Sequence, residues 1–184
     1  MTVILQRSGA VIVGPPRTAS RWLVQAVTAA GVPCWTAPGH QFPGQFGTGD
    51  RIVAVVRHPV GWLDSMYRTP TGAGVPLGWH VPHPAPGESL EDWVARSLDR
   101  PGCVGRFFRQ WRPPGSRVIR FECLVPDLLR VLREHGEKPD AAAVWAMSVH
   151  RDGAGRPAGP WPAELARQVC AAEQDFLTAF YPEG

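Results

Sequence analysis

Three short apolar runs stand out along the chain, at Ala10–Val13, Ile52–Val56 and Val118–Phe121. Each is rich in β-branched residues, and polar residues do not alternate with the apolar ones. Continuous apolar runs of this length are typical of strands in a parallel sheet that is covered on both faces. We therefore predict three buried parallel strands, with a weaker fourth strand near Pro33–Thr36.

Between and after these runs, apolar residues recur at the helical spacing of three or four positions. In the first such segment Trp22, Leu23 and Ala26 share one face. Gly31 then follows as a helix end. Strands that alternate with helices predict an α/β fold, here a three-layer parallel sheet flanked by helices and joined by right-handed crossovers. The predicted helices are Thr18–Ala30, Pro59–Arg68, Glu88–Leu98, Val104–Trp111, Val125–His135 and Ala163–Phe180.

The chain length of 184 residues fits a single domain, which we place over 1–184. No apolar run approaches the ~20 residues of a membrane span, and 1–5 is too short for a secretory signal. We therefore expect a cytoplasmic protein that does not enter a membrane. Prolines and glycines crowd 69–87 and 151–160. The first of these stretches predicts a long loop, which in a compact domain is usually functional or disordered.

Cysteine usage and charge narrow the possible functions only a little. The four cysteines are widely spaced and form no C-x-x-C pair, so neither a zinc site nor a disulfide framework is indicated. The net charge is +3, and Lys138 is the only lysine. An arginine guanidinium can bind two oxygens of a phosphate or sulfate group at once. A coding bias toward arginine over lysine explains the arginine excess equally well. The arginines at issue follow predicted strands instead of lining one face, so no nucleic-acid groove is predicted.

The segment 10–23 combines an apolar strand, a tight turn and the start of a helix. The free N–H groups and the positive dipole end of such a helix start can hold an anion. Arg17, Thr18 and Ser20 lie in the turn and add a guanidinium and two hydroxyls, so the segment predicts an oxyanion site. It lacks the motif of nucleoside triphosphatases, because no lysine follows a second glycine.

A second segment that carries an arginine follows the run at 52–56. We call this segment and the turn after residue 13, each at the end of a predicted strand, the two arginine corners. Arg57 leaves the predicted strand, and Ser65 comes eight positions later on the next predicted helix. A guanidinium and a hydroxyl could together hold one phosphate. Alternatively, Arg57 pairs with Asp64 or Glu122 at the surface. Because ligands bind beyond the carboxyl ends of parallel strands, we expect this corner and the turn after residue 13 to face one crevice.

Both segments resemble motifs of the sulfotransferases. The turn at 14–21 resembles the family's phosphosulfate-binding loop, in which a proline precedes Lys or Arg and then small and hydroxyl residues. The segment 57–65 resembles the motif in which an arginine, an x-Pro and a later serine hold the 3′-phosphate of the nucleotide. In this chain the interval from Arg57 to Ser65 is that of the family motif.

The resemblance continues, in the family's order, over about 11–180. Ser89–Val94 and Gly105–Trp111 resemble its helix pair, and we interpret these residues as packing. Arg120–Leu124 resembles the segment that ends the family's next strand, with Cys123 in place of the usual aspartate, and we interpret these residues as packing too.

Near the C-terminus, His150–Arg156 and Trp161 resemble the glycine-rich loop that closes the nucleotide site in many family members. Arg151 and Gly153 fit the start of that loop. The interval to Trp161 is longer than usual, so Arg156 is an alternative phosphate contact. A surface loop without a ligand is the other interpretation of this stretch.

The resemblance implies a P-loop NTPase-like fold and a sulfotransferase. Such an enzyme moves a sulfuryl group from 3′-phosphoadenosine 5′-phosphosulfate to a hydroxyl or amine, and it needs no metal. In sulfotransferases a Lys or Arg of the first loop neutralises the leaving 5′-phosphate as the S–O bond breaks, and the resemblance assigns this role to Arg17. The residues that the resemblance assigns to nucleotide binding are Arg17, Thr18, Ala19, Ser20, Arg21, Arg57, Ser65, Arg151 and Gly153.

The implied reaction also needs a general base for the acceptor's proton. His40 occupies the place of the family's K-T-H segment, although the Lys-Thr is absent, and it is our first choice. His80 and His83 are rivals, because their loop could fold over the crevice as a lid. Asp64 and His58 are less favoured, since both belong to the following helix.

Two other functions stay open. One is an ATP-dependent small-molecule kinase, which is disfavoured because no residue is placed to hold Mg²⁺ as the P-loop Ser/Thr and Walker-B Asp do. The other is a non-catalytic nucleotide-binding protein that keeps the fold, which the small size and the missing Lys-Thr favour. We expect the acceptor to be a small molecule or a glycan. The sequence leaves its identity and the oligomeric state open.

Overall fold

The computed structural model describes residues 2–47, 49–69, 81–100, 102–147 and 161–182. These residues form two compact units. Unit 1 comprises the described residues within Met1–Arg57 and Gln110–Arg151, and unit 2 those within His58–Arg109 and Asp152–Gly184. The single domain expected over 1–184 stays a prediction.

Unit 1 is built on a five-stranded mixed sheet, so the α/β fold class predicted from the sequence is confirmed. The strands lie in the order β3-β1-β2-β4-β5. Three of them, β2, β4 and β5, run parallel to one another as predicted. The bounds are β1 Thr2–Leu5, β2 Val11–Val13, β3 Cys34–Ala37, β4 Ile52–Val56 and β5 Arg117–Arg120.

The sheet is mixed and not purely parallel because β1, which the sequence reading missed, runs antiparallel to both of its neighbours. A tight turn joins β1 to β2. In it the Gly9 N–H donates to the Leu5 carbonyl at 2.9 Å, and Gly9 has a φ of +69°. A connection this short permits only an antiparallel pair, since a parallel pair needs a long crossover.

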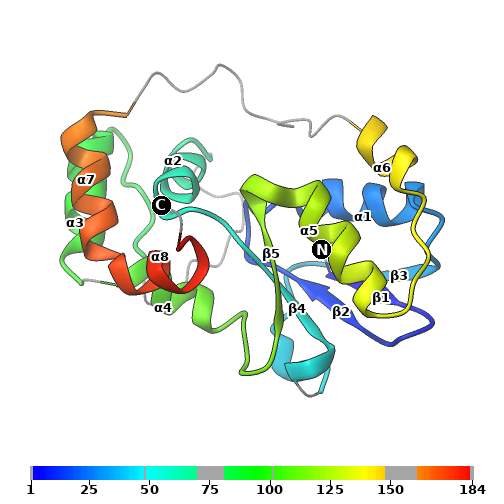
Figure 1. The fold of residues 1–184 in the computed structure, drawn as a ribbon. Helices are drawn as coiled ribbons and strands as arrows, with labels where there is room; N and C mark the ends of the chain where they lie inside the picture. Colours follow the sequence, from blue (N-terminus) through cyan, green and yellow to red (C-terminus); the bar gives the residue numbers. More distant parts are fainter. Residues whose placement is uncertain (1, 48, 70–80, 101, 148–160, 183–184) are drawn as a thin grey trace. The chain divides into compact units, whose positions relative to one another are not determined.

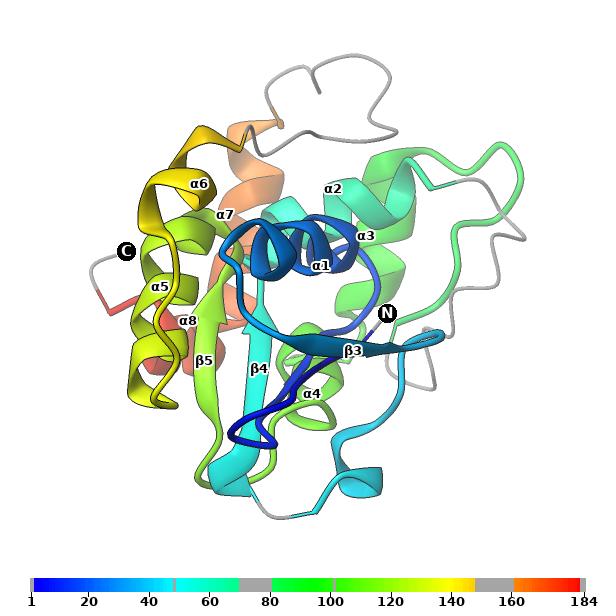
Figure 2. The same cartoon turned by 90° about the vertical axis from the view of Figure 1, so that its right-hand side faces the viewer.

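The carboxyl ends of four strands lie side by side at the same end of the sheet. Because β1 is antiparallel to both neighbours, β3 points the same way as β2, and β4 and β5 are parallel to β2. Figure 2 shows the arrows of β4 and β5 pointing the same way. The segments that follow these strands carry His40, Arg17, Arg57 and Phe121, in the spatial order of the strands.

Three helices pack with the sheet in unit 1: α1 Ser20–Ala29, α5 Leu124–Glu134 and α6 Ala141–Ala146 (Figure 1). Alternate strand residues such as Val53, Val55 and Ile119 form a core cluster with the apolar stripes of these helices. The sequence reading missed α6. This helix nevertheless begins with a common N-cap, because the Asp140 side chain accepts a hydrogen bond from the Ala143 N–H at 3.0 Å.

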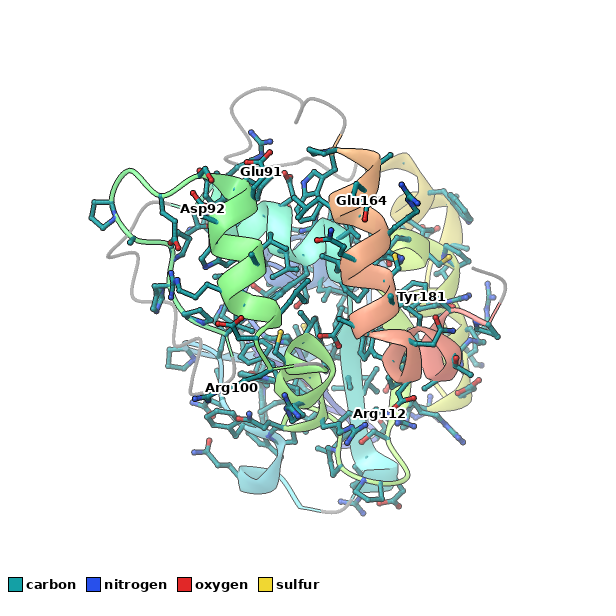
Figure 3. All side chains as sticks on the ribbon, turned by 90° about the vertical axis from the view of Figure 1, so that its left-hand side faces the viewer. Glu91, Asp92, Arg100, Arg112, Glu164 and Tyr181 are labelled. Atoms are coloured by element: carbon teal, nitrogen blue, oxygen red, sulfur yellow. The ribbon has the colours of Figure 1, made fainter. Side chains whose placement is uncertain are left out.

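Unit 2 is helical in its described residues. Its core contains a cluster of aromatic rings. The ring centroids of Trp62 and Phe107 are 4.9 Å apart, and those of Phe108 and Phe176 are 5.3 Å apart. Acidic residues lie in the first turns of α3 and α7, where the helix dipole favours them, and Figure 3 labels them as Glu91, Asp92 and Glu164. The helices are α2 Pro59–Tyr67, α3 Leu90–Leu98, α4 Cys103–Arg109, α7 Ala163–Ala172 and α8 Gln174–Phe180.

The single helix predicted over 163–180 is two helices, α7 and α8, with a break at Glu173. The Glu173 carboxylate is buried and accepts hydrogen bonds from the Val104 and Gly105 N–H groups, each at 2.8 Å. These donors lie in the first turn of α4, where they have no partner within the helix. A long-range contact therefore ends α7, and the periodicity of 163–180 does not reveal it.

None of the described helices combines the length and the apolar character needed to cross a membrane.

Candidate anion-binding site

The turn after β2, residues 14–19, is the centre of the candidate site in unit 1. Two of its non-glycine residues have left-handed backbone conformations, Arg17 with a φ of 69° and Ala19 with a φ of 60°. This conformation costs roughly 1–2 kcal/mol for a residue with a Cβ atom. Such strain persists only where the surrounding structure enforces it, and it is concentrated at functional sites.

Thr18 fixes the turn from the inside. Its hydroxyl is fully buried and donates to the Pro15 carbonyl at 2.6 Å. A threonine hydroxyl has a single hydrogen to donate. The structure therefore gives this side chain a part in shaping the turn.

The start of α1 supplies backbone donors. Ala19 is its N-cap and provides no side-chain cap. The N–H groups of Ser20, Arg21 and Trp22 have no hydrogen-bond partner within the described residues, and the first helical bond runs from Leu23 to Ala19. Unpaired donors together with the positive end of the helix dipole favour an anion at this point.

Gly14 lets the turn pass against β4. A Cβ atom at this position would lie 2.5 Å from Thr18 Oγ1 and 3.1 Å from Val55 Cβ. Alanine at 14 would therefore displace the hydroxyl that holds the turn, or the strand beside it. The close approach, and not backbone conformation, requires glycine here.

We expect Gly14→Ala to lower the free energy of unfolding by about 1–3 kcal/mol, the usual cost of overpacking. Urea denaturation of the purified variant measures this change. Gly44→Ala is the matched control, because a Cβ atom there would meet nothing within 4 Å. Equal stability of the two variants would show that the turn after β2 has room for a side chain.

The second arginine corner lies against this turn. The Arg57 guanidinium donates from Nη1 to the Arg17 carbonyl oxygen at 3.0 Å. Its Cζ also lies 4.0 Å from the centroid of the Phe121 ring, at the end of β5. The structure thus brings the Arg57 side chain to the backbone of Arg17. Their proximity agrees with the prediction that the segments after these two strands lie near each other.

Arg17 itself is half-buried. Loss of solvation and, to a lesser extent, the positive charge of Arg21 lower the pKa of its guanidinium from the ordinary value for arginine. Arginine is nevertheless protonated at neutral pH. A cation that has lost water and stands near a like charge gains from a bound anion.

His40 lies against the start of the same turn. Its Nδ1 is 2.9 Å from the Gly14 carbonyl oxygen, which can only accept a hydrogen bond. The neutral ring therefore carries its proton on Nδ1, and Nε2 presents the lone pair. Burial lowers the pKa of His40 from the ordinary value of 6.5. At neutral pH this ring is a base with its accepting nitrogen defined.

Aromatic rings hold His40 in place. The ring of His40 meets Trp111 edge-on, with 6.2 Å between centroids, and Trp111 is buried. Phe42 stacks on Trp111 at 4.8 Å. The sequence reading treated Trp111 and Phe121 as packing residues and passed over Phe42. Their proximity to the site depends on long-range contacts for which the sequence gives no local signal.

Several predicted site residues belong to unit 2, and each has contacts within it. Ser65 lies on α2, and its carbonyl accepts from the Thr69 hydroxyl at 2.8 Å. The Asp64 carboxylate binds Arg68 and the Trp161 indole N–H, each at 3.0 Å. The pairing of Ser65 with Arg57 on one phosphate stays a prediction.

The rival bases differ in their surroundings. His58 precedes α2 and meets the Tyr181 ring edge-on at 5.4 Å. His83 is exposed, and its carbonyl accepts from Arg96 at 2.9 Å. His80 lies outside the described residues, as do the predicted nucleotide contacts Arg151, Gly153 and Arg156.

Comparison with protein-family models, with curated proteins and with solved structures found no match for this chain. The function is therefore argued from the site in unit 1. That site combines a strained turn, unpaired N–H groups, two arginines and a neutral histidine at one edge of the sheet. Over the described residues, no group of three or more His, Cys, Asp or Glu side chains is arranged to hold a metal ion.

Proposed function

We propose that this protein is a sulfotransferase, which moves a sulfuryl group from 3′-phosphoadenosine 5′-phosphosulfate to a hydroxyl or amine of an acceptor. The observation that carries the proposal is the hydrogen bond from Arg57 to the Arg17 carbonyl. It joins the two corners that resemble the phosphosulfate loop and the 3′-phosphate motif. One small nucleotide with an anionic group at each end can reach both corners only if they are neighbours.

Each corner takes one end of the nucleotide in this proposal. The N–H groups at the start of α1 and the Arg17 side chain bind the 5′-phosphosulfate. Arg57 binds the 3′-phosphate through its guanidinium group. The Phe121 ring and the Arg17 carbonyl support this proposal because they fix the plane of that group. Ser65, Arg151 and Gly153 are further proposed contacts.

His40 acts as the general base. Its Nε2 takes the proton of the acceptor hydroxyl as the acceptor oxygen forms a bond to sulfur. The bond between sulfur and the bridging oxygen breaks, and its electron pair stays on the 5′-phosphate. Arg17 stabilises the charge that develops there, so its contribution is greatest in the transition state. The Nδ1–H bond to Gly14 keeps the base in the correct tautomer.

Calorimetry with the desulfonated nucleotide, 3′-phosphoadenosine 5′-phosphate, tests the proposal. We expect binding in the micromolar range without added metal, and much weaker binding of ATP with or without Mg²⁺. Tight magnesium-dependent binding of ATP would instead support a kinase. Binding of the 3′-phosphorylated nucleotide without any sulfuryl transfer to a panel of hydroxyl and amine acceptors would leave a non-catalytic nucleotide-binding protein.

We expect Arg57→Ala to weaken binding of this nucleotide by ~1.5–3 kcal/mol, the scale of a lost charge-assisted hydrogen bond. Arg57→Lys should lose part of this affinity, because an ammonium keeps the charge but not the fork. Arg130→Ala is the matched control, since Arg130 also donates to a backbone carbonyl of unit 1, that of Val118 at 2.9 Å. Unchanged affinity in Arg57→Ala would remove Arg57 from the site.

A further inference from the structure

At the outer edge of β3, some backbone groups have no partner among the described residues. Within the sheet that these residues form, β3 is the last strand on its side and pairs with β1 alone. The Gln6 N–H donates to the Pro33 carbonyl at 2.9 Å, which sets the alternation of the ladder. Pro33, Trp35 and Ala37 therefore face β1 with their backbone groups. The N–H and C=O groups of Cys34 and Thr36 point away from the sheet, and no described residue bonds to them.

The opposite edge of the same sheet is closed. The outward carbonyl of Val118 on β5 accepts from Arg130 at 2.9 Å, and the Arg120 N–H donates to the Asp127 carboxylate at 2.9 Å. Both side chains come from α5, which lies beside β5. Proteins commonly protect exposed sheet edges in this way against pairing with another chain. On β3, no charged or polar side chain in the described parts of the chain plays this role.

The composition around β3 also lacks the usual protection against pairing. No Asp, Glu, Lys or Arg occurs between Arg21 and Asp50. Trp35, in the middle of the strand, is 63% exposed. Cys34 packs against the core cluster, so Trp35 lies on the other face of the sheet. Two copies of this strand can therefore approach each other without charge repulsion.

We propose that β3 pairs antiparallel with β3 of a second copy of this chain, about a twofold axis at Trp35. In this register Cys34 of each copy lies opposite Thr36 of the other, and each such pair exchanges both of its N–H···O bonds. The two Trp35 residues form the central pair that is not hydrogen-bonded, where Cα atoms are about 4.5 Å apart and side chains meet. Figure 2 shows β3 on the side of the sheet nearest the viewer.

A second copy fits this edge because the edge complements itself. A twofold axis satisfies the same donors and acceptors on both chains with one set of contacts. Pro33 and Pro38 bound the strand on either side, and proline cannot extend a ladder. They confine pairing to the four residues of β3, which favours this one register.

Sedimentation velocity over a range of protein concentrations tests the dimer. We expect a species of twice the chain mass that dissociates on dilution. Thr36→Pro should abolish it, because it removes an outward N–H while leaving the bonds to β1, and Trp35→Lys should weaken it at least tenfold. Trp145→Lys is the matched control, since Trp145 is 61% exposed but lies on α6. Circular dichroism of each variant verifies that it folds.

Hydrogen exchange provides an independent measurement on the unmodified protein. The Cys34 and Thr36 amides should become protected as concentration rises, while the Trp35 amide is protected throughout by β1. A protein that stays monomeric at all concentrations, or a dimer that survives Thr36→Pro, would overturn the proposal. Loss of the dimer in Trp145→Lys alone would place the interface on α6 and overturn it equally. The inference does not depend on the nucleotide site.

Discussion

We expect His40→Asn to lower the turnover of sulfuryl transfer by about 10²–10⁴-fold, the usual contribution of a general base. The asparagine amide can still donate to the Gly14 carbonyl, so the contact that His40 makes at 2.9 Å is kept while the basic nitrogen is lost. Nucleotide affinity should therefore change little. Initial rates and calorimetry on the same preparation separate the two quantities.

His83→Asn is the control for this prediction. His83 was a rival base in the sequence, but its side chain is exposed and its carbonyl is the group that Arg96 contacts. Normal turnover in His40→Asn together with a large loss in His83→Asn would assign the base to His83. Equal, small losses in both variants would mean that neither histidine takes the proton.

The pH dependence has a defined sign. The reaction needs neutral His40, and burial lowers its pKa below 6.5. The rate should rise with pH through that lowered pKa and be flat at neutral pH. The contribution of His40 to the free energy of unfolding has the same sign. As the pH falls, His40 takes up its proton at a higher pH in the unfolded chain than in the folded one. This contribution is therefore fully present above pH ~6.5 and decreases as the pH drops toward the pKa of the folded state. His40→Asn should remove this component from the pH profile.

The second large effect is expected for Arg17→Ala, which should lower turnover by about 10²–10³-fold, the cost of losing one group that stabilises developing charge. Alanine has the same backbone preference as arginine at a φ of 69°, so the turn itself should not gain or lose strain. The carbonyl that accepts from Arg57 is also retained. Single-turnover rates at saturating nucleotide measure the effect.

Arg7→Ala is the control for the charge change. Arg7 is exposed in the turn between β1 and β2, outside the candidate site. Arg17→Lys should recover part of the rate, because it restores the positive charge but not the fork. A variant Arg17→Ala that binds nucleotide more weakly but turns over normally would contradict the role assigned to Arg17.

Most elements of the fold could be predicted from local pattern. The bounds of β4 match the apolar run at 52–56, and Pro59 begins α2 as proline at a first helical turn does. β1 was missed because a four-residue apolar stretch at a chain start has no periodicity to distinguish it. α6 was missed because six residues span fewer than two helical turns. Both depend on tertiary packing to form.

The candidate site was predictable in part. The proximity of Arg17 and Arg57 followed from neighbouring strand ends in a parallel sheet. His40 was chosen because it occupies the place of the K-T-H segment of the sulfotransferases. The direction of the Thr18 hydroxyl was not predictable, since it depends on how the turn closes onto Pro15. The Phe121 ring under Arg57 and the Trp111 edge against His40 come from segments that are distant in sequence.

The sequence by itself determined the α/β class, the parallel strands and the two arginines that follow them, because apolar periodicity and strand-end chemistry are local properties. Only the tertiary structure decided the antiparallel β1, the break at Glu173, the tautomer of His40 and the open edge of β3. Each of these depends on which donor meets which acceptor across the fold. Backbone and side-chain groups find such partners through chain folding, and the order of residues alone does not specify them.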